Sequence, residues 1–455
     1  MNAGHKEPIQ TSEKLMAEVD SVTSTHDLAT LTKEELKKSY LSDGRPWVIA
    51  YSGGKDSTLV LHLVYEVLVE LGSEAIKPIF VISSDTQVEA PNIVNYIGEA
   101  LKAVSEDAKK RCIPLTCHMV RPEVPDTFWS KLIGKGYPPP TRWFRWCTTN
   151  MKIKPSRRAI DEITAKYGSV ILLLGSRLAE SSQRKRGMES RVKNFRSLNA
   201  HHEIPDAFVL LPIASWSDNE VWEYLFSNNP PPWKRSHDQM LNLYKQAVGG
   251  ECPVVIDLST PSCGGSRFGC WTCTVVKVDK SMEGFIQTGD EWMKPLADFR
   301  SWLKEYRELA SVRMDRRRDG SQGPGPFTQA ARKEILERLL KLEAKVSMQL
   351  ISDEELLYIQ SIWSTEFDLN DTVIGLATKH RRVLSGGTPM PLNENEQTIL
   401  EDIAAERGLN PDLVAKVLAL EEEFPNLDRW GARPDLRRKL SELISVAEAN
   451  QDNYV

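Results

Sequence analysis

The sequence contains no long apolar run. No stretch approaches the ~20 consecutive apolar residues that a membrane-spanning helix needs, and residues 1–8 have no apolar core of a secretory signal. We therefore expect a cytoplasmic protein that makes no membrane contact. Internal repeats and low-complexity tracts are also absent from the sequence, which excludes repeat architectures.

The sequence has few cysteines and a small net charge. The chain has seven cysteines among 455 residues. An odd number in a chain expected to be intracellular argues against a disulfide framework and for metal or sulfur chemistry. The formal net charge of −5 excludes a protein that coats nucleic acid with a uniformly basic surface. Any contact with DNA or RNA must therefore use local basic patches. The length suggests about two to four domains.

A glycine pair lies between a strand pattern and a helix pattern. Residues 47–51 form a short apolar run typical of a buried strand, and helical spacing of leucine and valine begins after residue 56. The connecting hexapeptide at 52–57 is Ser-Gly-Gly-Lys-Asp-Ser. Glycines let the backbone approach a ligand closely, and a helix start presents unpaired N–H groups and partial positive charge. We therefore predict that this turn binds phosphate or pyrophosphate.

Further apolar runs follow at residues 77–86, 115–120 and 169–175, with helical patterns between them. Strands that alternate with helices predict an α/β fold with a doubly wound, mostly parallel sheet. The second strand ends in Asp85. Ligands of such sheets bind at the carboxyl ends of the strands, so this side chain is a candidate for nucleotide binding.

The hexapeptide at 52–57 resembles the S-G-G-x-D-S loop of the ATP pyrophosphatases, the PP-loop family. It differs from the Gly-x4-Gly-Lys-Ser/Thr loop of other NTPases. An Arg-Trp-Cys-Thr segment at 145–148 and a Gly-x-Arg-x-x-Glu-Ser-x-x-Arg segment at 175–184 make the chain similar to the PAPS/APS reductase branch of that family. Residues 211–222 resemble the element of that branch in which a helix, beginning here near Ser217, closes the nucleotide-binding domain.

This resemblance implies an adenine nucleotide alpha hydrolase-like fold, with ATP as cofactor and Mg²⁺ to accompany it. The catalytic residues that it implies are Lys55, Asp56 and Cys147. The residues implied to bind the nucleotide are Ser52, Gly53, Gly54, Lys55, Asp56, Ser57, Asp85, Arg177 and Arg184.

Four of the seven cysteines lie within residues 252–273. Cys270 and Cys273 form a C-x2-C pair, and Cys263 precedes them by seven residues. Structural zinc often takes two such pairs. An iron–sulfur cluster accepts irregular spacing, and a redox dithiol needs only the pair. We favour a [4Fe–4S] cluster, with zinc as the runner-up.

The sequence does not identify the fourth ligand of this metal centre. Cys252 is nearer in the chain, whereas Cys147 matches a cluster ligand of the APS reductases, and we favour Cys147. Those enzymes carry a second cysteine at the next position, where this chain has Thr148.

The cysteine-rich segment with residues 279–282, and the Gly/Pro-rich stretch at 323–328, resemble DndC-type sulfurtransferases of DNA phosphorothioation and their SspD relatives. The resemblance covers about residues 46–365. It implies an enzyme that adenylylates a DNA backbone phosphate with ATP and inserts sulfur. It also implies a cysteine desulfurase as sulfur donor and other proteins of the phosphorothioation complex as partners. The alternatives are an adenylyl-sulfate reductase, a tRNA thiolase, or a non-enzymatic scaffold that binds ATP and DNA.

Two basic segments are candidates for contact with nucleic acid. Arg142 and Arg145 could hold phosphate while Trp143 and Trp146 stack on bases, or the segment is a tryptophan-rich packing loop. The arginine-rich run at 313–318 is either a phosphate contact or a solvated face.

Four regions are expected along the chain. They are a helical leader at 1–45, a PP-loop domain at 46–248, a cysteine-rich iron–sulfur segment at 249–285 and a mainly helical region at 286–455.

Overall fold

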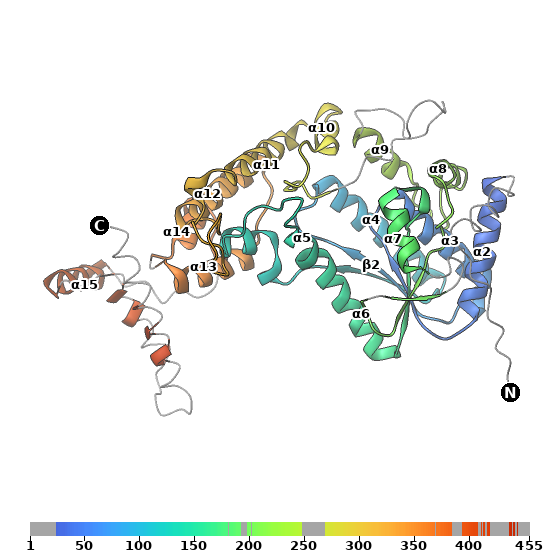
Figure 1. Cartoon of the computed structure of the whole chain (residues 1–455), viewed down its shortest axis with the longest axis horizontal. Helices are drawn as coiled ribbons and strands as arrows, with labels where there is room; N and C mark the ends of the chain where they lie inside the picture. The colour runs from blue at the N-terminus through green and yellow to red at the C-terminus, as the bar shows by residue number, and fades with distance from the viewer. Residues whose placement is uncertain are drawn as a thin grey trace. The chain divides into compact units, whose positions relative to one another are not determined.

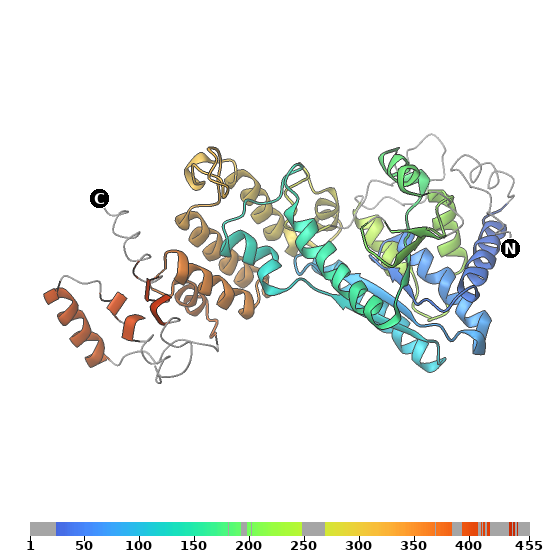
Figure 2. The same cartoon turned by 60° about the horizontal axis from the view of Figure 1, so that its bottom comes forward.

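The computed structural model describes residues 24–180, 182–192, 198–201, 203–247, 269–368, 370–384 and 394–407, with isolated positions between 411 and 444. The chain forms two compact units. Unit 1 comprises Met1–Pro122 and Pro140–Ala297, and unit 2 comprises Glu123–Pro139 and Asp298–Val455. Figures 1 and 2 show their helices and strands. None of the described helices combines the length and apolar character needed to cross a bilayer.

Unit 1 is built on a six-stranded sheet. Its strands are β1 (Trp47–Ala50), β2 (Ile79–Ser84), β3 (Leu115–Val120), β4 (Val170–Leu173), β5 (Asn199–Ala200) and β6 (Ala207–Leu210). They lie in the order β3-β2-β1-β4-β6-β5, and only the β5–β6 pairing is antiparallel among the described strands. The predicted α/β fold with a mostly parallel sheet is therefore confirmed.

The helices of unit 1 cover both faces of this sheet. They are α2 (Thr25–Leu41), α3 (Lys55–Leu71), α4 (Pro91–Lys110), α5 (Trp146–Thr148), α6 (Lys154–Tyr167), α7 (Ser182–Arg191), α8 (Asp218–Ser227), α9 (Asp238–Ala247) and α10 (Lys280–Gln287).

Helix α6 packs on one face, where its Ile160 joins Val48 of β1 and Leu172 of β4 in an apolar cluster. Helices α3 and α4 pack on the other face, against β1 and β3 respectively, and α2 and α8 pack on α3 (Figure 2). Successive strand residues point to opposite faces, so burial on both sides explains the continuous apolar runs in the sequence. The doubly wound arrangement is confirmed.

Local sequence explains where two of these helices begin. The buried face of α3 includes Leu59, Leu63 and Val67, as the helical spacing predicts. Ser217 accepts a hydrogen bond from the backbone N–H of Glu220, whose side chain accepts one from Ser217 in return. This reciprocal capping stabilises the start of α8, at the position expected from the sequence.

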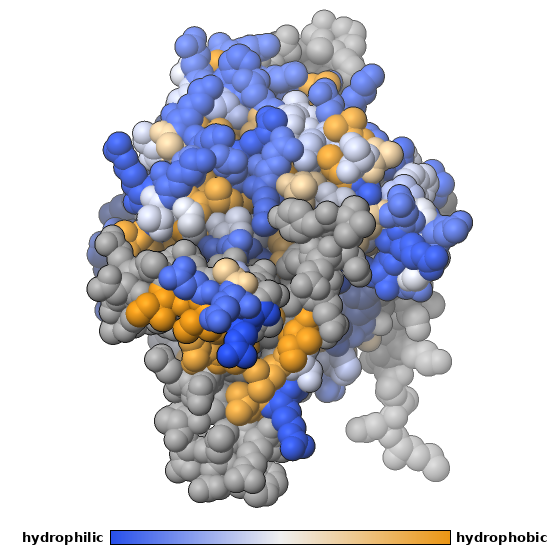
Figure 3. Space-filling model, turned by 90° about the vertical axis from the view of Figure 1, so that its left-hand side faces the viewer, coloured by the Kyte–Doolittle hydropathy of each residue, from blue (hydrophilic) through white to orange (hydrophobic). Residues whose placement is uncertain are grey.

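Unit 2 is mainly helical, as predicted. Its helices are most of α11 (Lys294–Tyr306), then α12 (Gln329–Val346), α13 (Asp353–Glu366), α14 (Thr372–Lys379) and α15 (Glu394–Arg407). On α15, Ile399 and Ile403 are 58 % and 52 % exposed. Figure 3 turns the side on which Figure 1 draws α15 toward the viewer and shows apolar residues exposed there among hydrophilic ones.

The segment Glu123–Pro139 belongs to unit 2 although it lies between strands of unit 1 in the sequence. The indole N–H of Trp129 donates to the carbonyl of Leu350 at 2.7 Å. Arg332 of α12 is buried and donates to the carbonyl of Ile133 at 2.8 Å. The first bond satisfies a carbonyl outside the segment and the second satisfies a carbonyl within it, so the segment and the rest of unit 2 stabilise each other.

Candidate functional site

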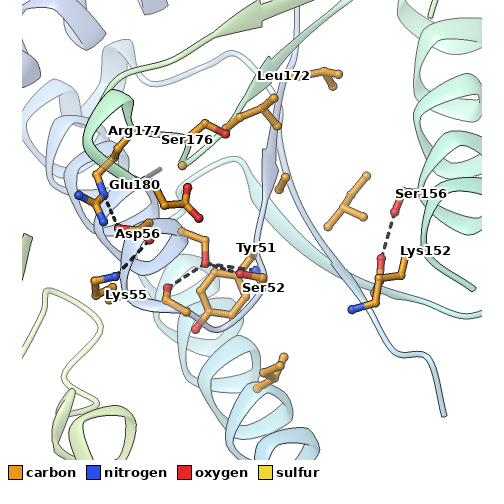
Figure 4. A pocket seen from close by; sticks show the side chains of 18 of the residues that line it. Tyr51, Ser52, Lys55, Asp56, Lys152, Ser156, Leu172, Ser176, Arg177 and Glu180 are labelled. Carbon is orange, nitrogen blue, oxygen red and sulfur yellow. Dashed lines mark hydrogen bonds and ion pairs between the residues drawn. The ribbon is translucent and has the colours of Figure 1, made fainter. Parts of the chain in front are cut away.

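A pocket of about 580 Å³ opens in unit 1 at the carboxyl ends of the strands. Strand β1 lies between β2 and β4, and the strand order reverses there, which is where doubly wound sheets bind ligands. Figure 4 shows side chains converging on this space from the hexapeptide, from the turn after β4 and from α6. Polar residues lining it are Ser52, Lys55, Asp56, Ser57, Ser84, Glu89, Lys152, Ser156, Ser176, Arg177, Glu180, Asp218 and Tyr244. Apolar residues lining it include Val48, Ile82, Ile160 and Leu172.

The hexapeptide at 52–57 forms a tight turn directly from β1 into α3. Gly53 has φ of +74°, and a Cβ there would lie 2.6 Å from Ile97 Cγ1, so both its conformation and its surroundings require glycine. The Ser57 hydroxyl accepts from the Ser52 N–H at 3.2 Å and donates to the Gly54 carbonyl at 2.9 Å. These bonds fix the turn at the helix start, where unpaired N–H groups favour an anion.

Two cations and two carboxylates form a connected network at the start of α3. Lys55 Nζ lies 3.5 Å from Asp56 Oδ2 and 3.2 Å from Asp218 Oδ1. Arg177 Nε donates to Asp56 Oδ1 at 2.6 Å (Figure 4), and its Nη2 donates to Asp218 Oδ1 at 2.7 Å. Burial alone would lower the pKa of Arg177, but Asp56 and Asp218 raise it. Arg177 is therefore held charged and immobile beside the pocket.

Neighbouring elements press closely on this network. A Cβ at Gly175 would lie 2.9 Å from the Asp56 backbone carbon and 3.0 Å from the Ser57 nitrogen. The Tyr244 hydroxyl of α9 accepts the Lys55 N–H at 3.2 Å. Burial raises the pKa of Tyr244 above its ordinary value. The turn after β4, at Gly175, and a helix nearly 200 residues away in the chain therefore both position the start of α3.

Another end of the pocket adjoins a cysteine. Glu89 and Lys152 line the pocket, and their side chains form an ion pair of 3.4 Å. Glu89 pairs through its backbone with Cys270 in an antiparallel bridge. The Cys270 sulfur lies 3.4 Å from Thr86 Oγ1. Burial raises the pKa of the Cys270 thiol to about 12.

Three of the predicted metal ligands, Cys147, Cys270 and Cys273, are linked by electrostatic interactions near this end of the pocket. Cys147 and Cys270 each interact electrostatically with Cys273 and with Lys152. Cys252 and Cys263 lie outside the described residues. Among the described residues, no three His, Cys, Asp or Glu side chains are arranged to hold a metal ion. A thiolate-ligated cluster therefore needs Cys263 or Cys252 to complete its donor set.

The predicted nucleotide-binding residues divide into three groups. Arg177 lines the pocket together with every residue of the hexapeptide except Gly53. Asp85 does not line it, and its carboxylate accepts hydrogen bonds from Arg121 Nε at 2.8 Å and from the Gln87 N–H at 2.8 Å. Arg184 belongs to α7, and its side chain lies outside the described residues.

Three functional candidates were not predicted from the sequence. Asp218 follows the cap of α8, a position that the resemblance had marked only as the start of a helix. Glu89 sits four residues after Asp85 without a distinguishing pattern, and Tyr244 occupies an ordinary position on an amphipathic helix. Only the folded arrangement brings these side chains to the pocket.

A turn that can bind phosphate at the reversal point of a doubly wound sheet defines a nucleotide-binding type of α/β protein. The family described as phosphoadenosine phosphosulfate reductase domain matches residues 46–276. This chain belongs to that family, so the predicted PAPS reductase branch is confirmed. A second match, to a small protein found in certain Dnd DNA modification systems, covers residues 395–445 and supports the predicted relation to DNA modification.

Similarity to individual proteins is more distant. An uncharacterised protein of Methanocaldococcus jannaschii, MJ0066, is 26 % identical over 283 residues, which are 59 % of this chain and 47 % of the relative. The chain thus spans about half the length of that relative.

Among solved structures, the PAPS reductase of Candida auris in a phosphate complex is 15 % identical. The match covers 52 % of this chain and 95 % of that one, with a TM-score of 0.30. The U34-tRNA thiolase NcsA of Methanococcus maripaludis with its [4Fe-4S] cluster is 13 % identical. That match covers 68 % of this chain and 89 % of that one, with a TM-score of 0.32.

Proposed function

We propose that this chain is an ATP-dependent sulfurtransferase of a DNA-modification system, which adenylylates a backbone phosphate and inserts sulfur to give phosphorothioate. The family match and the Dnd-system match support this proposal. The observation that carries it is that a turn suited to phosphate binding and a cysteine-containing region lie at the same pocket. The pocket that contains the phosphate-type turn also contains Glu89 and Lys152, which contact or interact with Cys270.

ATP would place its phosphates on the hexapeptide at 52–57. The helix start and Lys55 supply positive charge where negative charge develops on the leaving pyrophosphate. The apolar side chains of Val48, Ile82 and Leu172 line the same pocket and offer a surface for adenine. Mg²⁺, carried with the nucleotide, would add to this charge neutralisation.

The reaction has two phosphoryl steps. A non-bridging oxygen of the DNA phosphate attacks the α-phosphorus of ATP, the bond between that phosphorus and the bridging oxygen to the β-phosphate breaks, and pyrophosphate leaves. The terminal sulfur of a cysteine persulfide then attacks the activated DNA phosphorus, and AMP leaves. A second thiol cleaves the remaining S–S bond, which leaves sulfur on the DNA phosphate and a disulfide on the protein side. A cysteine desulfurase would supply the persulfide sulfur.

The thiols at this end of the pocket fit that chemistry. Cys147 lies where the resemblance expects a catalytic cysteine, beside Cys273 and Lys152. We propose Cys147, Cys263, Cys270 and Cys273 as ligands of a [4Fe–4S] cluster, with Cys252 as the alternative to Cys147. When bound, such a cluster would hold sulfur next to the nucleotide pocket.

The decisive experiment combines ATP turnover with analysis of DNA. Full-length protein purified without air is incubated with ATP, a sulfur donor and DNA, and pyrophosphate release is measured. Lys55→Gln should reduce release by about 10²–10³-fold, as loss of a charge-stabilising group does. Lys38→Gln removes an equal charge from an exposed position of α2 and serves as the matched control. Iodine should cleave genomic DNA only from cells that carry the gene.

Other outcomes would identify other functions. Sulfite formation from an adenylyl sulfate would indicate a reductase, and loss of a thiolated tRNA base on gene deletion would indicate a tRNA thiolase. ATP binding without pyrophosphate release under any of these conditions would indicate a non-enzymatic scaffold. Each of these results would contradict the proposal.

A further inference from the structure

We propose that the turn at residues 141–144 binds a single-stranded or locally opened segment of the nucleic-acid substrate. Trp143 would stack on one base, and Arg142 and Arg145 would hold the neighbouring phosphates. This inference rests on the proposed function, because it takes DNA as the substrate. It adds the element that engages the strand and the form of the strand that is engaged.

The turn is rigid. The Thr141 N–H donates to the Phe144 carbonyl at 3.1 Å, and the Phe144 N–H donates back to the Thr141 carbonyl at 3.3 Å and to the Thr141 hydroxyl at 3.0 Å. Three bonds thus close a four-residue segment. The backbone at its two central residues, Arg142 and Trp143, is held between these bonds, so a ligand need not order the main chain there.

Both ends of the turn are anchored next to the predicted cluster ligands. On one side, the hydroxyl of Thr274, the residue after Cys273, donates to the Pro140 carbonyl at 2.7 Å, and Thr274 is 1 % exposed. On the other side, Trp146 is 6 % exposed and Cys147 follows it in α5. A strand bound on the turn is therefore held beside the cysteines that are proposed to deliver sulfur.

Trp143 is unusual among the tryptophans of the chain. It is 93 % exposed, whereas Trp146, only three residues later, is buried. Trp292, at 40 %, is the next most exposed described tryptophan that the chain presents to solvent. An indole that is 93 % exposed contributes little to the core, and the next residue, Phe144, is also exposed, at 43 %. Two exposed aromatic side chains in succession offer rings on which bases can stack.

The charge around the turn selects an anionic partner. No aspartate or glutamate occurs between residues 127 and 160, although the chain as a whole carries a net charge of −5. Six basic residues occupy the part of this stretch in unit 1: Arg142, Arg145, Lys152, Lys154, Arg157 and Arg158. Of these, Lys152 pairs with Glu89 and Arg157 with Asp161. Arg142 and Arg145 are exposed and form no ion pair with any described residue. An acid-free stretch is suited to a polyanion.

The combination of one exposed indole and flanking arginines favours nucleic acid over a protein partner. Base stacking on an aromatic ring with phosphate contacts by neighbouring arginines is how proteins hold single strands. Phe144, next to Trp143 in the chain, is 43 % exposed and offers a second ring for stacking, while Arg142 and Arg145 flank the two rings with cations that can meet the neighbouring phosphates. In an intact duplex the base faces are covered by stacking, so Trp143 can act only on an unpaired or opened strand.

Binding of fluorescein-labelled oligonucleotides, followed by anisotropy, tests the inference. The full-length protein should bind a single strand of about 20 nucleotides more tightly than the duplex of the same sequence. Trp143→Ala should weaken single-strand binding about tenfold or more, and Trp143→Phe should restore most of it because stacking is retained. Arg142→Gln with Arg145→Gln should lower the slope of log K against log salt by about 0.7 for each phosphate contact that is lost.

Matched controls separate this effect from general damage. Trp292→Ala removes an exposed tryptophan elsewhere, and Lys109→Gln with Lys110→Gln removes two exposed charges from the end of α4. Both should leave affinity unchanged. Equal affinity of wild type and Trp143→Ala for the single strand would overturn the inference and point to a protein partner instead. The proposed function and this inference can fail independently. Strand binding that depends on Trp143, without sulfur in the DNA, would contradict only the proposed function. Sulfur insertion together with unaltered strand binding by Trp143→Ala would contradict only the inference.

Discussion

Arg177 donates a 2.6 Å hydrogen bond to the carboxylate of Asp56, although 121 residues separate them in the chain. The bond joins the turn after β4 to the first turn of α3, and it is completed by Asp218 from a third element. Arg177 is 1 % exposed. A buried cation between two carboxylates aligns the groups around the pocket before any ligand arrives, which is what precise phosphate binding requires.

We expect Arg177→Ala to destabilise unit 1, because it removes a buried guanidinium and leaves the part-buried carboxylates of Asp56 and Asp218 to Lys55 alone within this network. Removing one member of a buried ion pair costs about 3–5 kcal/mol. Arg177→Lys should recover only part of the loss, since lysine lacks the forked geometry that contacts both carboxylates. Urea unfolding followed by tryptophan fluorescence measures the change. Arg157→Ala breaks an exposed pair with Asp161 and should cost less than about 1 kcal/mol; equal costs for the two arginines would contradict the expectation.

Gly175 provides a second test of how tightly the pocket wall is packed. Gly175→Ala should prevent the turn after β4 from closing on α3, because its Cβ would lie 2.9 Å from backbone atoms that cannot move aside. We expect lower thermal stability and weaker ATP binding, measured by calorimetry. Gly98→Ala is the matched control: a Cβ at that position of α4 meets nothing within 4 Å, and it should stabilise by about 0.5–1 kcal/mol. Similar effects of the two changes would remove close packing as the reason for glycine at 175.

The parts of the site that are local in sequence could be predicted from sequence. The hexapeptide at 52–57 combines a period change, two glycines and a helix start within a few residues, and the structure forms the expected turn there. Asp218 and Tyr244 could not be found in this way. They reach the pocket from α8 and α9, and nothing in a local pattern reports which distant helix packs beside a given strand end.

The sequence also could not predict which side chains tertiary packing buries, or which unit a segment joins. Trp143 and Trp146 share a local environment of arginine and aromatic residues and were given the same role, but one is exposed and the other buried. The position of Glu123–Pro139 in unit 2 follows from bonds such as that from Arg332 to the carbonyl of Ile133. That bond joins residues 199 positions apart in the chain, and composition and periodicity do not encode such a pairing.

Stability should fall in mildly acidic solution because of a buried histidine. His237 is 5 % exposed and its ring lies 3.3 Å from His62 Nδ1. Burial, followed by repulsion from His62, lowers the pKa of His237 to about 3. In the unfolded chain a histidine titrates near pH 6.5. The unfolded state therefore binds an extra proton below pH 6.5, and the stability that the neutral ring contributes is lost progressively as the pH falls toward 3.

Urea midpoints at pH 7.5 and 5.5 measure this effect. We expect the wild type to lose stability between them with a limiting slope of about 1.4 kcal/mol per pH unit for one proton, and His237→Gln to lose less. Neighbouring Glu66 does not titrate in this range: burial would raise its pKa, but hydrogen bonds from His62 and Tyr224 lower it to about 2. His118→Gln, at an exposed position on β3, should keep the wild-type pH dependence. The same dependence in His237→Gln would show that other groups cause it.

The cysteines offer the sharpest test of the proposed metal centre, because two of them compete for one role. We expect Cys263→Ser, Cys270→Ser and Cys273→Ser each to abolish the brown colour and the iron and acid-labile sulfide of protein purified without air. Cys112→Ser should retain them, since Cys112 is exposed and lies outside the cysteine-rich segment.

Cys147→Ser and Cys252→Ser then identify the fourth ligand. Cys147 interacts electrostatically with Cys273 and Lys152, so we expect Cys147→Ser to lose the cluster and Cys252→Ser to keep it. The reverse result would assign the fourth position to Cys252 and leave Cys147 free to carry persulfide sulfur. Stoichiometric zinc in a colourless wild type would replace the iron–sulfur centre with a structural one, and the transferred sulfur would then have to travel on cysteine thiols alone.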